Sequence, residues 1–570
     1  MAVHKKDVVK LLKTIATYME IKGENRFKIA AFQKAAAALE RDDRSLSDIY
    51  DFTSISGIGK GTSAVIKEFM ETGESKTLQN LKKEVPEGLI PLLKLPGLGG
   101  KKIGKLYQQL GVVDLDSLKT ACESHQVRNL QGFGEISEEK ILAAIQEWDE
   151  RPERLPLARV LPIAEEIEKF LEKEASIVRF SRAGSLRRMK ETVKDLDFVI
   201  ATESIEKTKN CLLSMPNIRE VIAKGDTKIS VELMLDVKVN VDFRLVHPQV
   251  FASALLHFTG SKEHNVKLRQ LAKERGEKIS EYGVEIIETG EILSFESERA
   301  LYKHFDLPLI PPEVREEGTE VEKYTGGLIS VEQMKGDLHM HSTWSDGAHS
   351  IREMAEAARK KGYKYIAITD HSQFLKVANG LTPQRLQQQK EEIDRLNDQY
   401  GDFTILKGVE MDILPDGTLD YQDEFLKDLD IVIAAIHSGF SQPHEVIMER
   451  LKSALFNRHV DIIAHPTGRL IGGRKGYDVD IDMLLQLAKE TNTILELNAN
   501  PNRLDLCVEH LQKAQELGVK VAINTDAHSI DMLNDMEIGV AYARKAFIRP
   551  EVVVNTWDIG QLRQFLKKKC

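Results

Sequence analysis

The sequence predicts a multidomain protein of the α/β and α classes: helical domains first, an α+β region next and a distorted β/α barrel last. A chain of 570 residues is too long for one hydrophobic core, and the usual ~100–200 residues per domain imply about three to five folded units. Two patterns predict the classes. A glycine motif repeats in the first part of the chain, and β-rich runs alternate with helix-patterned segments over residues 336–570. Such alternation is typical of parallel β/α units.

The composition is that of an ordinary globular protein, with 42% hydrophobic and 29% charged residues. No apolar run approaches the ~18 residues of a membrane-spanning helix, and the lysine-containing start does not resemble a signal peptide. The cysteines are too far apart for a CxxC metal or redox pair, which fits a reducing compartment. They are Cys122, Cys211, Cys507 and Cys570. We therefore expect a soluble, cytoplasmic protein with no membrane partner.

The charge is unevenly distributed along the chain. The formal net charge is −10, but residues 1–110 contain 19 Lys and Arg against 13 Asp and Glu, a balance of +6. A positively biased N-terminal region can contact phosphates, while the acidic remainder can hold metal ions on carboxylates.

The glycine motif occurs at residues 55–61 (ISGIGKG) and again at residues 95–101 (LPGLGGK). A looser copy at residues 130–134 precedes a helix-patterned stretch from Ser137 to Trp148. A single G-x-G usually marks an ordinary turn, but repetition with similar apolar flanks favours a shared function. Each copy is expected to lead into a helix N-terminus, which is a natural phosphate site.

This pattern resembles the helix-hairpin-helix motif, which binds the DNA backbone without reading sequence. The resemblance implies DNA contacts from Gly57, Gly59, Lys60, Gly97, Gly99 and Lys101.

Two changes in composition mark the next boundaries. Pro152 and Pro156 precede a charged helix expected from about Leu161 to Glu174. Near Pro308 a second break is followed by the acidic stretch 313–322 and a Gly-Gly pair, which indicate a linker.

Between these boundaries, Asp195-Leu196-Asp197 opens an apolar, strand-like run, and the period of two places both carboxylates on one face. Asp242 lies in a second strand-like run that could bring it alongside them. Three carboxylates can hold two Mg²⁺ ions for phosphoryl transfer. The alternative is a solvated acidic strand face, which is about as frequent for an isolated D-x-D.

The preceding Gly184-Ser185 favours the metal site, because Gly-Ser, a D-x-D and a distant Asp together resemble the nucleotidyltransferase palm of DNA polymerase beta. The segment 257–265 (HFTGSKEHN) also resembles the family's Tyr-Phe-Thr-Gly-Ser segment. The resemblance implies Asp195, Asp197 and Asp242 as catalytic ligands of two Mg²⁺ or Mn²⁺ ions. It implies nucleotide contacts from Gly184, Ser185, Arg188, His257, Phe258, Gly260 and Asn265. His257 departs from the family's Tyr, so discrimination against ribonucleotides does not follow from the resemblance.

Ten of the sixteen histidines lie in residues 336–570, and several directly follow β-rich runs. Because the carboxyl ends of barrel strands converge on one mouth, we expect these side chains to meet in one metal site. The candidate ligands are His339, His341, Asp346, His371, Glu410, His437, His465, Asp526 and His528. Any one of them alone would more often be a structural residue. His349, His444, His459 and His510 are left as surface or core residues.

The spacing of these residues resembles the PHP domain, named for polymerase and histidinol phosphatase. Mixed imidazole and carboxylate ligands suit two or three Mn²⁺, Zn²⁺ or Fe²⁺ ions, which generate hydroxide for attack on phosphorus. The resemblance implies removal of 3′-terminal nucleotides, with cleavage at abasic sites as a further activity.

Together the two resemblances indicate a bacterial-type family X DNA polymerase with a C-terminal PHP domain. We expect a monomer that uses deoxynucleoside triphosphates to fill short gaps in base excision repair, on gapped or primed double-stranded DNA. The expected division is two helix-hairpin-helix domains (1–80 and 81–150), palm (151–248), thumb (249–315), linker (316–335) and PHP domain (336–570).

Two alternatives remain. The chain could be a phosphoesterase whose first half only delivers it to DNA, or a DNA-end scaffold without catalysis, for which missing ligands would be expected. A primer-extension assay distinguishes a polymerase from the phosphoesterase alternative. We also expect no 5′-deoxyribose phosphate lyase activity, because the lysine nucleophile of the polymerase beta branch falls on Val65, with Lys60 and Lys67 as less suitably placed neighbours.

Overall fold

The computed structural model describes residues 5–42, 46, 49–95, 97–149, 154–235 and 237–566. The chain forms two compact units, one built mostly on residues 1–152 and the other on most of residues 153–570. Across the described ranges, no helix is both long and apolar enough to cross a membrane.

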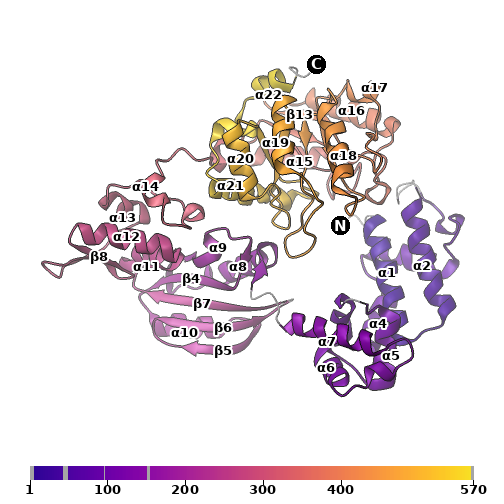
Figure 1. The fold of residues 1–570 in the computed structure, drawn as a ribbon, viewed down its shortest axis with the longest axis horizontal. Helices are drawn as coiled ribbons and strands as arrows, with labels where there is room; N and C mark the ends of the chain where they lie inside the picture. The colour runs from indigo at the N-terminus through magenta and orange to yellow at the C-terminus, as the bar shows by residue number, and fades with distance from the viewer. Residues whose placement is uncertain are drawn as a thin grey trace. The chain divides into compact units, whose positions relative to one another are not determined.

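The described residues of the N-terminal unit form seven α-helices, drawn in indigo to purple in Figure 1. They pack around one apolar core that includes Leu12, Ile15, Ile66, Ile103 and Leu106. All three glycine motifs lead into helices, as predicted, since α3, α5 and α7 begin directly after Gly59, Gly99 and Gly134. The helices are α1 (Lys5–Lys22), α2 (Arg26–Arg41), α3 (Lys60–Thr72), α4 (Lys76–Glu84), α5 (Gly100–Leu110), α6 (Leu115–Glu123) and α7 (Glu135–Asp149).

The second unit begins with a five-stranded sheet in the order β2-β4-β7-β6-β5, in which only β4 and β7 are parallel. Helices α9 and α11 lie against β4 (Figure 1). The strands are β2 (Ile177–Arg182), β4 (Asp195–Thr202), β5 (Ile218–Lys224), β6 (Lys228–Met234) and β7 (Lys238–Val246), with a short antiparallel pair of β1 (Leu155–Pro156) and β3 (Thr192–Val193). The helices are α8 (Leu157–Leu171), α9 (Gly184–Arg187) and α10 (Ile205–Leu213).

Helix α8 begins four residues before the predicted start at Leu161 and ends at Leu171, before the predicted Glu174. Leu157 and Val160 are fully buried, so the apolar face of the helix starts earlier than its charged pattern. Pro162 lies inside the helix, although an interior proline usually ends one. Burial of this apolar face therefore outweighs the local proline signal.

The region that follows is helical, with a small antiparallel sheet in the order β10-β9-β8. Its core contains Leu256, Leu268, Leu301, Tyr302 and Phe305. The elements are α11 (Phe251–Thr259), α12 (Lys262–Glu274), β8 (Glu277–Ser280), β9 (Gly283–Ile286), β10 (Ile292–Leu293), α13 (Glu298–His304), the 3₁₀ turn η7 (Pro312–Val314) and α14 (Glu320–Lys323).

The acidic stretch expected to be a linker packs against this core. Glu320 is 3% exposed, and its carboxylate lies 2.6 Å from Nδ1 of the fully buried His264. Glu313 is also buried and is paired with Arg544. These acidic residues therefore serve as buried hydrogen-bond and ion-pair partners, which composition alone does not distinguish from a solvated linker.

The C-terminal part contains a seven-stranded, entirely parallel sheet whose strands follow chain order from β11 to β17. A parallel bridge between Met340 and Ala527, just beyond the two outermost strands, nearly closes it into the expected barrel. The strands are β11 (Gly336–Asp337), β12 (Tyr365–Ile368), β13 (Thr404–Asp412), β14 (Ile431–Ala435), β15 (Ile462–Ile463), β16 (Ile494–Asn498) and β17 (Val521–Asn524).

Helices surround these strands, as Figure 1 shows for α15, α18 and α19 around β13. They are α15 (Ile351–Lys360), α16 (Pro383–Asn397), α17 (Asp423–Leu426), α18 (His444–Phe456), α19 (Ile481–Glu490), α20 (Val508–Leu517), α21 (Asp535–Lys545) and α22 (Ile559–Leu566). The strand interiors are buried on all sides, which matches their continuous Val, Ile, Leu and Ala runs.

Candidate active sites

The three aspartates predicted from the D-x-D pattern lie together on two neighbouring strands. Asp195 and Asp197 are on β4, and Asp197 is the direct register partner of Asp242 on β7. Because successive side chains of a strand point to opposite faces, Asp195 and Asp197 share one face while Leu196 and Phe198 are buried on the other. The parallel pairing of β4 and β7 therefore brings the three carboxylates side by side.

The electrostatics of this cluster favour a bound cation. Burial, followed by the negative charges of Asp195 and Asp242, raises the pKa of Asp197 to about 7. Asp242 also accepts a hydrogen bond from Ser230 at 2.6 Å and forms a 2.7 Å ion pair with Lys228. An all-carboxylate donor set of this kind suits Mg²⁺ or Mn²⁺.

Gly184 packs directly on the cluster. It begins α9 with a φ of +56°, and a Cβ atom there would lie 2.1 Å from Oδ2 of Asp197. Both the backbone conformation and the close approach require glycine at this position.

Beyond α9, a pocket of about 370 Å³ opens against α11 and α12. Five of the predicted nucleotide-binding residues line it, and Lys262 and Arg269 add two cations that were not predicted. The lining residues are Arg188, His257, Phe258, Thr259, Gly260, Ser261, Lys262, Asn265 and Arg269. The other two predicted nucleotide contacts, Gly184 and Ser185, lie on α9. Lys262 and Arg269 lie on either side of the predicted Asn265 in the sequence. Their positive charge near that residue was the signal that could have identified them as pocket residues.

The pocket is held in shape by hydrogen bonds between its own walls. Arg188 donates from Nη1 to the carbonyl oxygen of Thr259, and Asn265 donates to the carbonyl oxygen of His257 at 2.8 Å. Burial lowers the pKa of His257, so its ring is neutral near pH 7. The pocket charge therefore comes from arginine and lysine, which suit a polyphosphate ligand.

The glycines of the N-terminal motifs adopt the predicted turn. Gly57 and Gly97 have φ angles of +108° and +78°, in the left-handed region that favours glycine. Gly59 and Gly99 are the N-caps of α3 and α5, and their Cα atoms have no neighbour that an added Cβ would touch. This open space leaves room for another molecule to approach the backbone.

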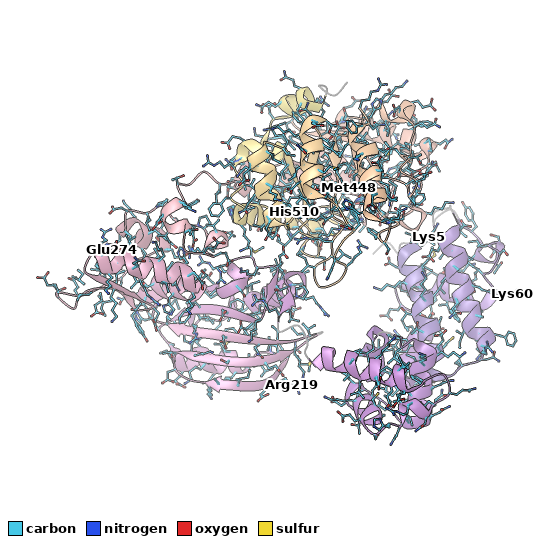
Figure 2. All side chains as sticks on the ribbon, viewed as in Figure 1. Lys5, Lys60, Arg219, Glu274, Met448 and His510 are labelled. Atoms are coloured by element: carbon cyan, nitrogen blue, oxygen red, sulfur yellow. The ribbon has the colours of Figure 1, made fainter. Side chains whose placement is uncertain are left out.

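The two predicted lysines of these motifs are exposed in the first turns of their helices, Lys60 on α3 and Lys101 on α5. Figure 2 labels Lys60 on the N-terminal unit. Val65, in contrast, is 8% exposed and belongs to the apolar core.

In the barrel, all nine candidate metal ligands lie at or after the carboxyl ends of strands. Glu410 is on β13, and the others follow β11, β12, β14, β15 and β17. Three groups place their ligand atoms within 4.8 Å of one another: His341, Asp346, His371 and His528; His339, His341 and Asp526; and His371, Glu410 and His437. His465 Nε2 lies 3.0 Å from Glu410 Oε1. Mixed imidazole and carboxylate donors at this density fit transition-metal ions.

Buried carboxylates that were not predicted orient these histidines. Glu496, in the middle of β16, lies 2.7 Å from Nδ1 of His339, and Asp412 lies 3.1 Å from Nδ1 of His437. Such partners fix the ring so that the other nitrogen faces the metal. Burial lowers the pKa of His339, but Glu496, Asp526 and Glu410 outweigh it and raise that pKa well above 6.5. The excess of negative charge again favours bound cations.

The signals for these supporting residues were weak but present in the sequence. Asp412 follows Glu410 by two positions on the same strand face, and Glu496 interrupts the apolar run of β16 between Leu495 and Leu497. A third carboxylate, Asp370, immediately precedes His371 and accepts hydrogen bonds from Ser342, Ser345 and Gln389. None of the three carboxylates had a spacing that distinguished it from an ordinary buried acid.

Family models match three parts of the chain. A helix-hairpin-helix domain matches residues 3–75, a DNA polymerase beta thumb matches residues 254–316, and a PHP domain matches residues 337–500. With the aspartate-bearing sheet between the first two, these matches define the class: a DNA polymerase of the polymerase beta type with a C-terminal PHP domain.

A protein of Bacillus subtilis (strain 168), "DNA polymerase/3′-5′ exonuclease PolX", is 63% identical over 567 residues, which is 99% of this chain and 100% of the relative. The chain therefore belongs to the family X DNA polymerases that carry a PHP domain. A "probable phosphatase" of Thermoanaerobacter sp. (strain X514) is 34% identical over 244 residues, 41% of this chain and 94% of its own length. Another, of Citrobacter koseri, is 30% identical over 247 residues, again 41% of this chain and 94% of its own length.

Proposed function

We propose that this enzyme, a DNA-directed DNA polymerase with a 3′-5′ exonuclease, fills short gaps during base excision repair. The observation that carries the proposal is the pairing of β4 with β7, which aligns Asp197 with Asp242 beside a cation-lined pocket. Its substrates are deoxynucleoside triphosphates and gapped or primed double-stranded DNA. In this proposal the domains divide as the sequence predicts, with the palm ending near residue 248 and the PHP domain starting at residue 336.

For synthesis, Asp195, Asp197 and Asp242 hold two Mg²⁺ or Mn²⁺ ions, which supply activation of the primer 3′-hydroxyl and charge neutralisation at the triphosphate. Arg188 binds phosphate oxygens through its forked guanidinium, since planar paired donors match phosphate geometry. His257, Phe258, Gly260 and Asn265 contact the sugar and base of the incoming nucleotide. Gly184 and Ser185 present the start of α9 to the triphosphate.

Replacement of Asp242 by alanine tests the synthesis site. We expect loss of primer extension with 3′ trimming retained, because the change removes a carboxylate from β7 and leaves the barrel residues intact. Asp226→Ala is the matched control, since this palm aspartate is 79% exposed and outside the cluster. Undiminished extension by the Asp242 variant would overturn the assignment. An unmodified enzyme that trims the primer but does not extend it would instead favour the alternative in which the chain is a phosphoesterase that its first half only delivers to DNA.

For trimming, the nine barrel ligands would hold two or three ions of Mn²⁺, Zn²⁺ or Fe²⁺, which would supply activation of water for hydrolysis of the terminal phosphodiester. Glu496 and Asp412 keep the rings of His339 and His437 oriented. We include cleavage at abasic sites as a further activity of the same centre, since it too is phosphodiester hydrolysis.

The double variant His339→Ala/His341→Ala tests the trimming site. It should abolish 3′ trimming and spare single-nucleotide addition, because both imidazoles belong to the grouped ligands. The matched control is His444→Ala/His459→Ala, two barrel histidines outside the ligand set. Full-rate trimming by the first variant would show that another site hydrolyses DNA.

DNA binding comes from the N-terminal glycine motifs, with Gly57, Gly59 and Lys60 in the first and Gly97, Gly99 and Lys101 in the second. The open backbone at Gly59 and Gly99 and the positive bias of residues 1–110 support this assignment. We propose that the enzyme acts as a monomer in the cytoplasm. The described cysteines Cys122, Cys211 and Cys507 are free thiols, as a reducing compartment favours.

A further inference from the structure

A helix of the barrel, α21, contacts the polymerase part of the same compact unit at the loop that follows α9 and at η7. Tyr542 on α21 donates a hydrogen bond to the carboxylate of Glu191, and Arg469 lies 2.8 Å from the same carboxylate. Two residues further along α21, Arg544 pairs with Glu313 at 2.5 Å. The loop that carries Arg188 is therefore held by side chains of the PHP domain.

The last residue of this helix, Lys545, contacts Arg188, which lines the nucleotide pocket. Its Nζ atom is 2.5 Å from Oε1 of Glu316 and 3.3 Å from the carbonyl oxygen of Arg188. The side chain of Lys545 is 11% exposed and that of Glu316 is 21% exposed, so this ion pair is largely shielded from solvent. An ion pair in such surroundings is screened less than one on the surface.

Glu316 contacts two more cations on the pocket side. Lys190 lies 2.8 Å from Oε2 of Glu316, and Nε of Arg188 lies 3.5 Å from Oε1. Burial raises the pKa of Glu316, but Lys545 and the other cations outweigh it, so that pKa is lowered and the carboxylate is ionised at neutral pH. One carboxylate is thus shared by three cations, one of which, Arg188, lines the nucleotide pocket.

This sharing determines how strongly Glu316 competes for Arg188. A carboxylate bound to one close lysine attracts a second cation at 3.5 Å less than an unshared carboxylate would, because the net charge of the pair is near zero. If Lys545 is removed, the full negative charge of Glu316 acts on Arg188 and Lys190. The triphosphate must then displace that carboxylate to bind Arg188.

We propose that Lys545 is a positioning residue of the polymerase reaction: by neutralising Glu316 from the PHP domain, it leaves Arg188 available to the triphosphate of the incoming nucleotide. The proposal rests on the assignment of Arg188 as a triphosphate ligand. It makes the PHP domain a structural part of the nucleotide site, separate from its own metal centre.

The test is steady-state gap filling of one nucleotide by the full-length enzyme, with KM for the nucleotide and kcat measured separately. Lys545→Ala should raise KM about tenfold, equal to about 1.4 kcal/mol, with little change in kcat. Lys545→Arg should restore KM, since it keeps the charge. Lys513→Ala, which removes an exposed barrel lysine paired with Asp482 at 2.6 Å, is the control and should change neither constant.

The double variant Lys545→Ala/Glu316→Gln separates this mechanism from a purely structural or long-range charge effect. Once Glu316 carries no charge it cannot compete for Arg188, so KM should return close to the wild-type value. A double variant as impaired as Lys545→Ala overturns the proposal, and so does an unchanged KM in the single variant. Retained 3′ trimming by each variant verifies folding.

Arg188→Ala is measured in the same series to test the assignment of Arg188 as a triphosphate ligand separately from the role of Lys545. An unchanged KM in this variant would refute the nucleotide-site assignment itself. A raised KM in Arg188→Ala with no effect of Lys545→Ala would refute only the role of Lys545.

Discussion

Gly184→Ala should disable DNA synthesis by displacing one metal-binding carboxylate. A Cβ at this position would lie 2.1 Å from Oδ2 of Asp197, and contacts under 3.0 Å essentially never occur for real Cβ atoms. Asp197 must therefore move by roughly 1 Å, and misplacements of about that size cost about 100-fold in rate, or about 3 kcal/mol. The φ of +56° adds about 1 kcal/mol of backbone strain for alanine.

The assay is single-nucleotide extension on gapped DNA under single-turnover conditions, with 3′ trimming measured on the same preparation. Gly276→Ala is the matched control, because Gly276 has a φ of +74° but no neighbour within reach of a Cβ. The Gly276 variant therefore has similar backbone strain but no steric clash between the new Cβ and a neighbouring residue. Extension by Gly184→Ala within a few-fold of this control would refute the close-packing argument, as would an equal loss of trimming.

Three further predictions concern the buried Glu298, the glycines of the N-terminal motifs and Val65. Burial raises the pKa of Glu298, but the positive charges of Arg315 and Arg187 outweigh this effect and lower that pKa from 4.5 to about 2. Glu298→Gln should then cost about 3 kcal/mol of unfolding free energy at pH 7. The difference in unfolding free energy between the wild type and this variant should shrink as pH falls from 4.5 towards 2. If guanidinium unfolding gives the same difference at every pH, this prediction is wrong. Bulky substitutions of Gly59 and Gly99 should weaken DNA binding equally for all sequences in salt titrations, and a strong base preference of the unmodified protein would count against phosphate contacts. With Val65 in place of a nucleophilic lysine, borohydride should trap no adduct with a 5′-deoxyribose phosphate substrate, and an adduct within residues 1–80 would show that another lysine acts.

The parts of the fold that the sequence predicted well are those with strong local periodicity. The D-x-D strand was recognisable because Asp195 and Asp197 alternate with buried apolar residues. The barrel was recognisable because its strands are buried on all sides and are therefore continuous apolar runs followed by polar ligands. The start of α8 was misplaced because the helix was placed by its charged pattern, whereas its buried apolar face begins earlier, at Leu157.

What the sequence could not provide was the pairing of charges distant along the chain. Glu313 is 231 positions from Arg544, its partner, and nothing in the local pattern separates it from a solvated acid. The same holds for Glu496, which is 157 positions from His339. Such partners become visible only when the fold brings the elements together, so these partner residues were missed, while the candidate ligands beside Glu496 were predicted.

The central claim is that one chain carries two metal sites with opposite effects on a primer end. It is tested most directly by incubating the wild-type enzyme with Mn²⁺ and a gapped duplex labelled at the primer 5′ end, with and without nucleotides. We expect extension of the primer across the gap when nucleotides are present and shortening from the 3′ end when they are absent. A primer that changes length in only one direction under both conditions would contradict it.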